Sequence, residues 1–288
     1  MFIASLIARP GALDPALVTN LRNAWGGGDS IWLAPDTAAE FALSVSPDNL
    51  EEVRSAVADQ ADLNLVPATN RRKRMLLADM DSTMIEQECI DELAEAAGIG
   101  AQVKQITARA MNGELDFDGA LTERVALLKD LPEQVIAEVL DTRITLMPGG
   151  ATLLATMKRD GAYAALVSGG FTAFTRAIAA QLGFDETRAN TLQVEDGKLT
   201  GAVGHPILGR EAKVQALDEI TARLGIGPED VLAVGDGAND LGMLTRAGLG
   251  VALHAKPAVQ AQVSCRVNHG DLTALLYLQG YAQTEFAA

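Results

Sequence analysis

Two aspartates two residues apart, Asp79 and Asp81, are the residues of this chain that most clearly suggest chemistry. They follow an apolar run, residues 75–78, as expected where a buried strand ends. Alternate side chains of an extended segment point to the same side, so both carboxylates can face one site. An ionised carboxylate can attack phosphorus, and a second carboxyl can protonate the leaving oxygen and then take a proton from water. The pair therefore predicts a nucleophile at Asp79 and a general acid and base at Asp81.

A second acidic cluster, residues 235–240, follows a later apolar run and has a glycine on either side of Asp236. Magnesium prefers oxygen ligands and commonly takes one or two carboxylates together with phosphate oxygen and water. Asp79, Asp236 and a backbone carbonyl would suit it, with Asn239 close behind. The expected metal-binding aspartates are Asp79, Asp81 and Asp236, supported by Asp240.

A serine and two glycines, Ser168, Gly169 and Gly170, follow a third apolar run. Their hydroxyl and accessible backbone N–H groups are suited to phosphate oxygens. Lys213 is the best candidate for a fixed positive charge on the phosphoryl group. Judged alone, Lys213 fits a lysine on the surface of a helix better.

The formal net charge of −15 argues against nucleic acid as a partner, because binding it requires a basic face. The same charge repels a phosphate ester, so local cations must attract it. No apolar run approaches the roughly 18 residues that span a bilayer, and no membrane partner is expected. Cys89 and Cys265 have neither metal-site nor disulfide spacing. We therefore expect both cysteines to be reduced and buried as small hydrophobic residues, as in a protein of the reducing cytoplasm.

Strands that alternate with helices after residue 75 predict a doubly wound α/β core. The carboxyl ends of such strands meet at one edge of the sheet, which would bring the polar residues above together. Residues 86–142 are nearly all helical in pattern and form a candidate cap, inserted after the first core strand. Further helices are expected over residues 150–159, 172–182 and 211–224.

The first seventy residues have the pattern strand, helix, strand, strand, helix, strand, which predicts a split ferredoxin-like (βαββαβ) α+β module. By this pattern it resembles the ACT-type regulatory domains. The basic run at residues 71–74 is interpreted as a solvated linker rather than a docking patch. The expected domains are residues 1–70 and 71–288, the latter with a core at 75–85 and 143–288 and a cap at 86–142.

Together, the spaced motifs over about residues 75–270 resemble the haloacid dehalogenase superfamily of phosphotransferases. Within the cap, residues 86–90, 106–107, 110–114 and 117–125 resemble the phosphoserine phosphatase family. That resemblance implies that Glu88 contacts a substrate ammonium and Arg124 its carboxylate, while an apolar wall lines the pocket. The implied substrate-binding residues are Glu88, Met111, Phe117, Arg124, Ser168, Gly169, Lys213 and Asn239.

The resemblance also implies a reaction, the magnesium-dependent hydrolysis of O-phospho-L-serine to L-serine and phosphate through an aspartyl phosphate. This is the last step of serine biosynthesis. The charge pair agrees with such a substrate, because an amino-acid zwitterion needs one anion and one cation. Ala120 departs from the family, which usually has serine there, and this bears on the fine geometry of the cap.

Other readings stay open. The substrate could be another small phosphomonoester, such as phosphohomoserine or phosphothreonine. A protein of another class would be a phospho-acceptor that senses an amino acid through residues 1–70. Arg124 could instead pair with Glu123 or Glu114 at the surface, and Glu88 could simply sit in the first turn of a helix. A homodimer is left open as well.

Overall fold

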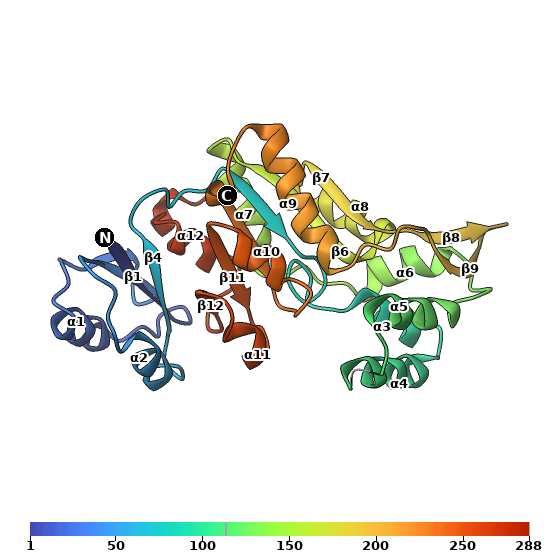
Figure 1. The fold of residues 1–288 in the computed structure, drawn as a ribbon, viewed down its shortest axis with the longest axis horizontal. Helices are drawn as coiled ribbons and strands as arrows, with labels where there is room; N and C mark the ends of the chain where they lie inside the picture. Colours follow the sequence, from blue (N-terminus) through green and yellow to red (C-terminus); the bar gives the residue numbers. More distant parts are fainter. Residues whose placement is uncertain (113, 288) are drawn as a thin grey trace. The chain divides into compact units, whose positions relative to one another are not determined.

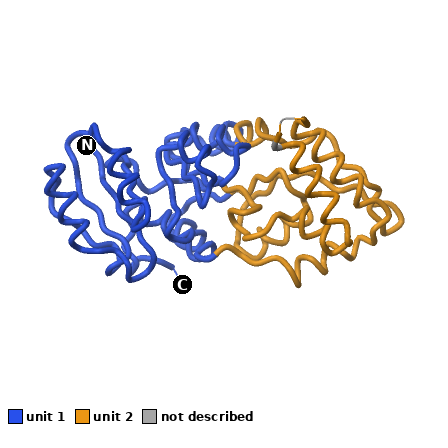
Figure 2. The backbone as a smooth tube through the Cα atoms, turned by 90° about the horizontal axis from the view of Figure 1, so that it is seen from below, with its two compact units in different colours: residues 1–77, 148–164, 217–288 blue, residues 78–147, 165–216 orange. Residues whose placement is uncertain are grey.

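The structure is a computed structural model that describes residues 1–112 and 114–287. It contains a six-stranded sheet of order β12-β11-β10-β5-β6-β7, a four-stranded sheet of order β2-β3-β1-β4 and a hairpin, β8-β9 (Figure 1). The chain forms two compact units (Figure 2). Unit 1 comprises Met1–Leu77, Pro148–Ala164 and Leu217–Ala288, and unit 2 comprises Ala78–Met147 and Ala165–Ala216.

The N-terminal residues form the antiparallel sheet and two helices that their pattern predicts. β1 pairs with both β3 and β4, and apolar side chains such as Leu6, Phe41 and Leu63 are buried beneath it. Asp14 begins the first helix, since its carboxylate accepts a hydrogen bond from the N–H of Ala16 at 2.8 Å. The elements are β1 (Phe2–Ile7), α1 (Pro15–Ala24), β2 (Ile31–Ala34), β3 (Ala38–Leu43), α2 (Leu50–Ala56) and β4 (Asp62–Pro67).

The core strands are buried runs, and the pairs β10–β11, β11–β12 and β6–β7 are parallel, which confirms the predicted α/β class. The predicted bounds of β5, α7 and α8 agree with the structure. The strands are β5 (Met75–Ala78), β6 (Tyr163–Phe171), β7 (Glu186–Asn190), β10 (Val231–Gly235), β11 (Leu249–Leu253) and β12 (Cys265–Val267). The helices are α7 (Gly150–Arg159), α8 (Thr172–Leu182), α9 (Arg210–Leu224), α10 (Leu241–Arg246), α11 (Pro257–Gln260) and α12 (Ala274–Leu278).

The segment predicted as a helical cap consists of four helices within unit 2. α4 packs between α3 and α5, and α6 packs on α3. Strand β9 of the β8–β9 hairpin, which the sequence pattern did not indicate, packs on α5. The helices are α3 (Cys89–Ala96), α4 (Gly100–Met111), α5 (Phe117–Ala126) and α6 (Gln134–Thr142), and the hairpin strands are β8 (Leu192–Glu195) and β9 (Lys198–Val203). None of the helices in the described part of the chain is long and apolar enough to cross a membrane.

Within unit 1, the outer edge of β12 is covered by side chains of the N-terminal module. The amide of the fully buried Asn64 donates to the carbonyl of Arg266 at 2.9 Å and accepts from its N–H at 2.8 Å. This reciprocal pair replaces the backbone bonds that a further strand would make. An edge strand needs such protection, because its unpaired backbone groups are a template for aggregation.

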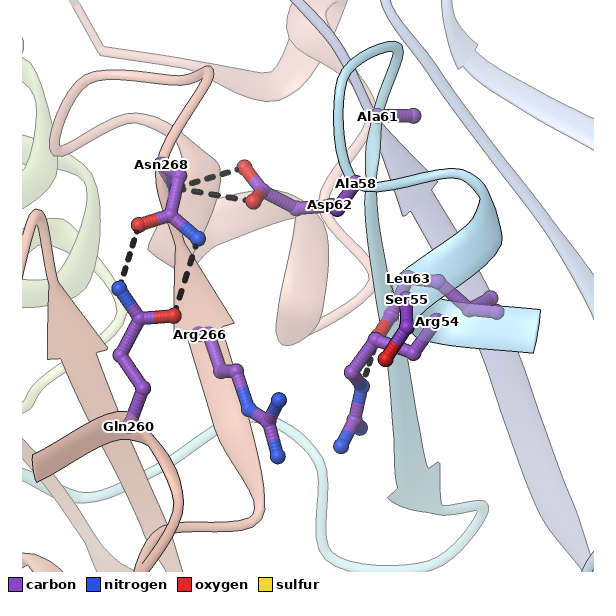
Figure 3. A pocket seen from close by; sticks show the side chains of 9 residues that line it. All are labelled: Arg54, Ser55, Ala58, Ala61, Asp62, Leu63, Gln260, Arg266 and Asn268. Carbon is purple, nitrogen blue, oxygen red and sulfur yellow. Dashed lines mark hydrogen bonds between the residues drawn. The ribbon is translucent and has the colours of Figure 1, made fainter. Parts of the chain in front are cut away.

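Two more side chains extend this protection along the segment. Asp62 accepts from the backbone N–H groups of Asn268 and His269, both at 2.8 Å, and Arg54 donates to the carbonyl of Ser264 at 3.0 Å. Figure 3 shows Asp62 directed toward Asn268 across a cavity of about 100 Å³. Backbone groups within β12 and just before and after it are therefore hydrogen-bonded by residues more than 200 positions away in sequence.

The basic run after the N-terminal module is solvated only in part: Arg72 and Arg74 are exposed, whereas the side chain of Arg71 is 14% exposed. Arg71 binds the buried carboxylate of Glu40 through two hydrogen bonds of 2.9 and 2.6 Å. Arg72 lies over the ring of Tyr281, 3.9 Å from its centroid, and pairs with Glu285 at 2.6 Å. Each guanidinium thus has a defined partner, because the folded chain supplies carboxylates and a ring that the local sequence does not contain.

Candidate active site

The predicted nucleophile, Asp79, lies directly after β5, is 5% exposed and is paired with a buried cation. The ammonium of Lys213, in α9, lies 2.7 Å from its Oδ1. Lys213 is itself only 1% exposed, so the alternative of a surface helix lysine is wrong. A buried ammonium at this distance stabilises the charged carboxylate and supplies the local positive charge that a phosphate ester needs in an acidic protein.

Asp81, the predicted acid, has a different environment. Its Oδ1 accepts a hydrogen bond from the backbone N–H of Cys89 at 3.0 Å. Burial, and next the negative charge of Glu88, raise the pKa of Asp81 to about 6, while the Cys89 hydrogen bond and the charge of Lys213 act in the opposite direction. A carboxyl with this pKa can hold a proton near neutrality and release it, which suits a general acid that later acts as a base.

Three carboxylates form a group that fits a magnesium ion. Asp79, Asp236 and Asp240 each offer an oxygen, and these atoms all lie within 4.8 Å of one another. Like charges gathered this closely repel unless a cation joins them, and Mg²⁺ prefers oxygen ligands of this kind. Asp240 is fully buried and accepts from the N–H of Gly237 at 2.9 Å. Among the described residues the group contains Asp240, expected only to support the site, and not Asp81.

The structure extends β6 through residues 168–170, which the sequence pattern placed after the strand, and this segment approaches Asp81 closely. The Oγ of the buried Ser168 accepts from the N–H of Gly170 at 2.8 Å. A Cβ at Gly170 would lie 2.6 Å from Asp81 Oδ2, and one at Gly169 would lie 3.0 Å from the ring of Phe117. The two glycines thus let Asp81 and Phe117 lie against this segment of β6.

Asn190, a residue that the sequence did not single out, holds this segment of β6 in place. It is 2% exposed, donates to the carbonyls of Gly169 at 2.8 Å and Leu208 at 3.2 Å, and accepts from the N–H of Leu208 at 2.7 Å. An asparagine at the end of a short strand usually indicates a turn, so no local signal identified it.

Arg124, the predicted carboxylate ligand, lies on α5 and is half-buried. Its Nε donates to the carbonyl of Ala120 at 3.2 Å. Burial lowers the pKa of Arg124, while the negative charges of Asp91, Glu88 and Asp81 raise it. The guanidinium therefore lies in the same group of charges as the general acid.

The proposed surface partners of Arg124 are taken by another arginine. Arg109 pairs with Glu123 at 2.7 Å and with Glu114 at 3.8 Å. Pairing of Arg124 with either glutamate at the surface is therefore not what the structure shows.

The other predicted substrate-binding residues differ in exposure. Glu88 precedes α3, is exposed and accepts a hydrogen bond from the hydroxyl of Ser82 at 2.8 Å. Asn239 is half-buried in the loop after β10. The side chain of Met111 lies outside the described part of the structure.

Comparison with known proteins agrees with this arrangement. A profile of haloacid dehalogenase-like hydrolases matches residues 76–245. A phosphoserine phosphatase of Streptomyces coelicolor is 43% identical over 261 residues, 88% of this chain, which spans 63% of that protein's length. One of Archaeoglobus fulgidus is 41% identical over 243 residues, covering 82% of this chain and 70% of that protein.

A solved structure extends the similarity to the N-terminal module. A haloacid dehalogenase family hydrolase of Salmonella enterica serovar Typhi superposes with a TM-score of 0.88 at 33% identity, covering 96% of this chain and 97% of that one. The fold, the aspartate pair and the matched segment lead to one conclusion. The chain belongs to the haloacid dehalogenase-like hydrolase family.

Proposed function

We propose that this protein is a magnesium-dependent phosphoserine phosphatase. The observation that carries the proposal is the position of two opposite charges beside the general acid. Glu88 and Arg124 both act electrostatically with Asp81. Phosphoserine presents an ammonium and a carboxylate next to the ester oxygen that the acid must protonate, so one anion and one cation beside Asp81 match it.

Two residues carry the covalent chemistry. A carboxylate oxygen of Asp79 attacks phosphorus, the bond to the serine oxygen breaks, and Asp81 gives its proton to that oxygen. Serine leaves, and the phosphoryl group remains on Asp79 as an acyl phosphate. Asp81, now ionised, takes a proton from water, whose oxygen attacks phosphorus and releases phosphate and the free Asp79 carboxylate.

Charge on the transferring group is offset by neighbouring groups, which is where most phosphoryl-transfer catalysis originates. Lys213 lies against Asp79, and the end of β6 with Ser168 and Gly169 offers a hydroxyl and backbone N–H groups. A magnesium ion held by Asp79, Asp236 and Asp240 would supply a further positive charge for the phosphoryl oxygens.

A panel of phosphomonoesters, assayed with magnesium and again with EDTA, tests the proposal. We expect steady phosphate release from phosphoserine well beyond one equivalent, lower rates with phosphothreonine and phosphohomoserine, and loss of activity in EDTA. Release that stops at one equivalent would indicate a phospho-acceptor instead. A higher kcat/KM for phosphothreonine or phosphohomoserine would change the assigned substrate.

The organisation of the chain belongs to the same proposal. We infer an ACT-like domain at residues 1–70 and a phosphatase domain at 71–288 with its cap at 86–142, supported by a four-stranded sheet complete within Phe2–Pro67. A cytoplasmic location is supported by two buried cysteines without disulfides. A homodimer remains part of the proposal and is tested by light scattering.

A further inference from the structure

The loop between β5 and α3 joins the general acid to the predicted ammonium ligand through short-range hydrogen bonds. At one end, Asp81 accepts from the N–H of Cys89 at 3.0 Å. Between Asp81 and Cys89, the N–H of Ser82 donates to the carbonyl of Gln87 at 3.2 Å, and the hydroxyl of Ser82 donates to Glu88 Oε1 at 2.8 Å. The acid and Glu88 are therefore parts of one closed loop.

The backbone of Ser82 has an unusual conformation for a residue with a side chain. Its φ is 52°, in the left-handed region that favours glycine. A residue in this region is destabilised unless its surroundings hold it there, and such positions cluster at functional sites. The hydrogen bond to Glu88 gives the side chain of Ser82 a defined task in this site.

Glu88 depends on that hydrogen bond for its orientation. It is exposed and precedes α3 without making a side-chain capping bond to the helix. The neighbouring Gln87 is fixed, because its side-chain amide makes two hydrogen bonds of 2.8 Å with Thr145. The backbone before Glu88 is thus anchored, and the hydroxyl of Ser82 is the donor that sets the direction of its carboxylate among the described residues.

We propose that Ser82 is a positioning residue for substrate selection, whose hydroxyl holds the Glu88 carboxylate ready for the ammonium group of an amino-acid phosphomonoester. This inference rests on the proposed function. An exposed glutamate has large rotamer freedom. Fixing its side chain before the substrate binds reduces the conformational entropy that is lost on binding. Loss of that pre-organisation is expected to raise KM for phosphoserine by about five- to thirtyfold.

Two variants of Ser82 separate the effect of losing its hydroxyl from the effect of its strained backbone. Ser82→Gly removes the hydroxyl and accepts the positive φ, whereas Ser82→Ala removes the hydroxyl and keeps the strain. With phosphoserine, both variants should raise KM by a similar factor and change kcat less. With p-nitrophenyl phosphate, which has no ammonium group, KM should change much less. In a Glu88→Gln background, Ser82→Gly should add little further loss, because the two residues act as one unit.

Three outcomes would overturn the assignment of Ser82. The first is an equal rise in KM for both substrates. The second is a normal KM for phosphoserine in Ser82→Gly with only Ser82→Ala impaired. The third is that Ser82→Gly raises KM by its full factor again in the Glu88→Gln background. Failure of the proposed function looks different. There the unaltered protein shows no preference for phosphoserine, or Glu88→Gln leaves the ratio between the two substrates unchanged.

Discussion

Asp79 and Asp81 are two residues apart, yet their electrostatic neighbours differ in sign. Asp79 has the Lys213 ammonium 2.7 Å from its carboxylate, whereas the strongest charge acting on Asp81 is the negative one of Glu88. A nearby cation favours an ionised carboxylate, and burial with a nearby anion favours a protonated one. These two environments suit the roles proposed for the two side chains, a nucleophile at Asp79 and an acid at Asp81.

The raised pKa of Asp81 predicts a pH dependence of the first chemical step. Because the pKa is about 6, the protonated acid predominates below that pH and is lost above it. Single-turnover release of serine from phosphoserine should therefore decline as pH rises above about 6. p-Nitrophenol scarcely needs an acid to leave, so p-nitrophenyl phosphate is the control and should show no such decline. An Asp81→Asn variant that keeps the decline would exclude Asp81 as its source.

Arg124→Ala should impair phosphoserine far more than p-nitrophenyl phosphate, which lacks the carboxylate. Loss of a charge-assisted hydrogen bond typically costs roughly 1.5–3 kcal/mol, or about ten- to a hundredfold in kcat/KM. Arg109→Ala is a matched control, since Arg109 pairs with Glu123 and Glu114 at the surface. If the Arg124 variant loses the same factor on both substrates, the guanidinium serves the phosphoryl group or the fold of the cap instead.

At the scale of elements, the end of β6, proposed to bind the phosphoryl group, is held by the side chain of Asn190. Asn190→Ala leaves the N–H of Leu208 and the carbonyl of Gly169, both half-buried, without this partner. A polar group left unsatisfied costs up to about 1–3 kcal/mol, so the unfolding temperature should fall. Because the proposed role of this segment is to bind the phosphoryl group of any substrate, kcat/KM should fall equally for phosphoserine and p-nitrophenyl phosphate. Asn23→Ala, at an exposed position, is the control, and a loss confined to phosphoserine would contradict the role.

At the scale of the whole molecule, removal of residues 1–70 should destabilise the protein even though no predicted catalytic residue is lost. The deletion uncovers the edge of β12 and removes Glu40 from Arg71 and Asn64 from Arg266. We expect a lower unfolding temperature and concentration-dependent aggregation, measured by thermal denaturation and size-exclusion chromatography.

A full-length Asn64→Ala variant isolates the contribution of that edge. It should lose roughly 1–3 kcal/mol for each backbone group left unsatisfied. A shortened protein that melts like the full chain and stays monodisperse would show instead that the phosphatase domain does not need the N-terminal module.

Much of the fold could be predicted because it depends on neighbours along the chain. The apolar run of β5 and the periodic patterns of α7 and α8 predicted those elements with the bounds that the structure shows. The hairpin of β8 and β9 was not predicted, because its strands are short and largely exposed and lack a continuous apolar pattern. Residues directly after buried strands were also predictable, as Asp79 and Asp236 show, whereas β6 continues past Ser168 to Phe171.

The amino-acid sequence alone determined the chemistry of the site: the carboxylates, their spacing, their place at strand ends and the charge pair of the cap. Tertiary structure decided which candidates share an environment. A lysine in a helical pattern looks the same whether its face meets water or Asp79, so only packing could show Lys213 to be buried. Likewise, Asn64 and Arg266 are 202 positions apart, and no local pattern encodes their pairing. Burial and long-range contacts depend on how the whole chain folds, whereas strands, helices and turns depend mainly on neighbouring residues in the sequence.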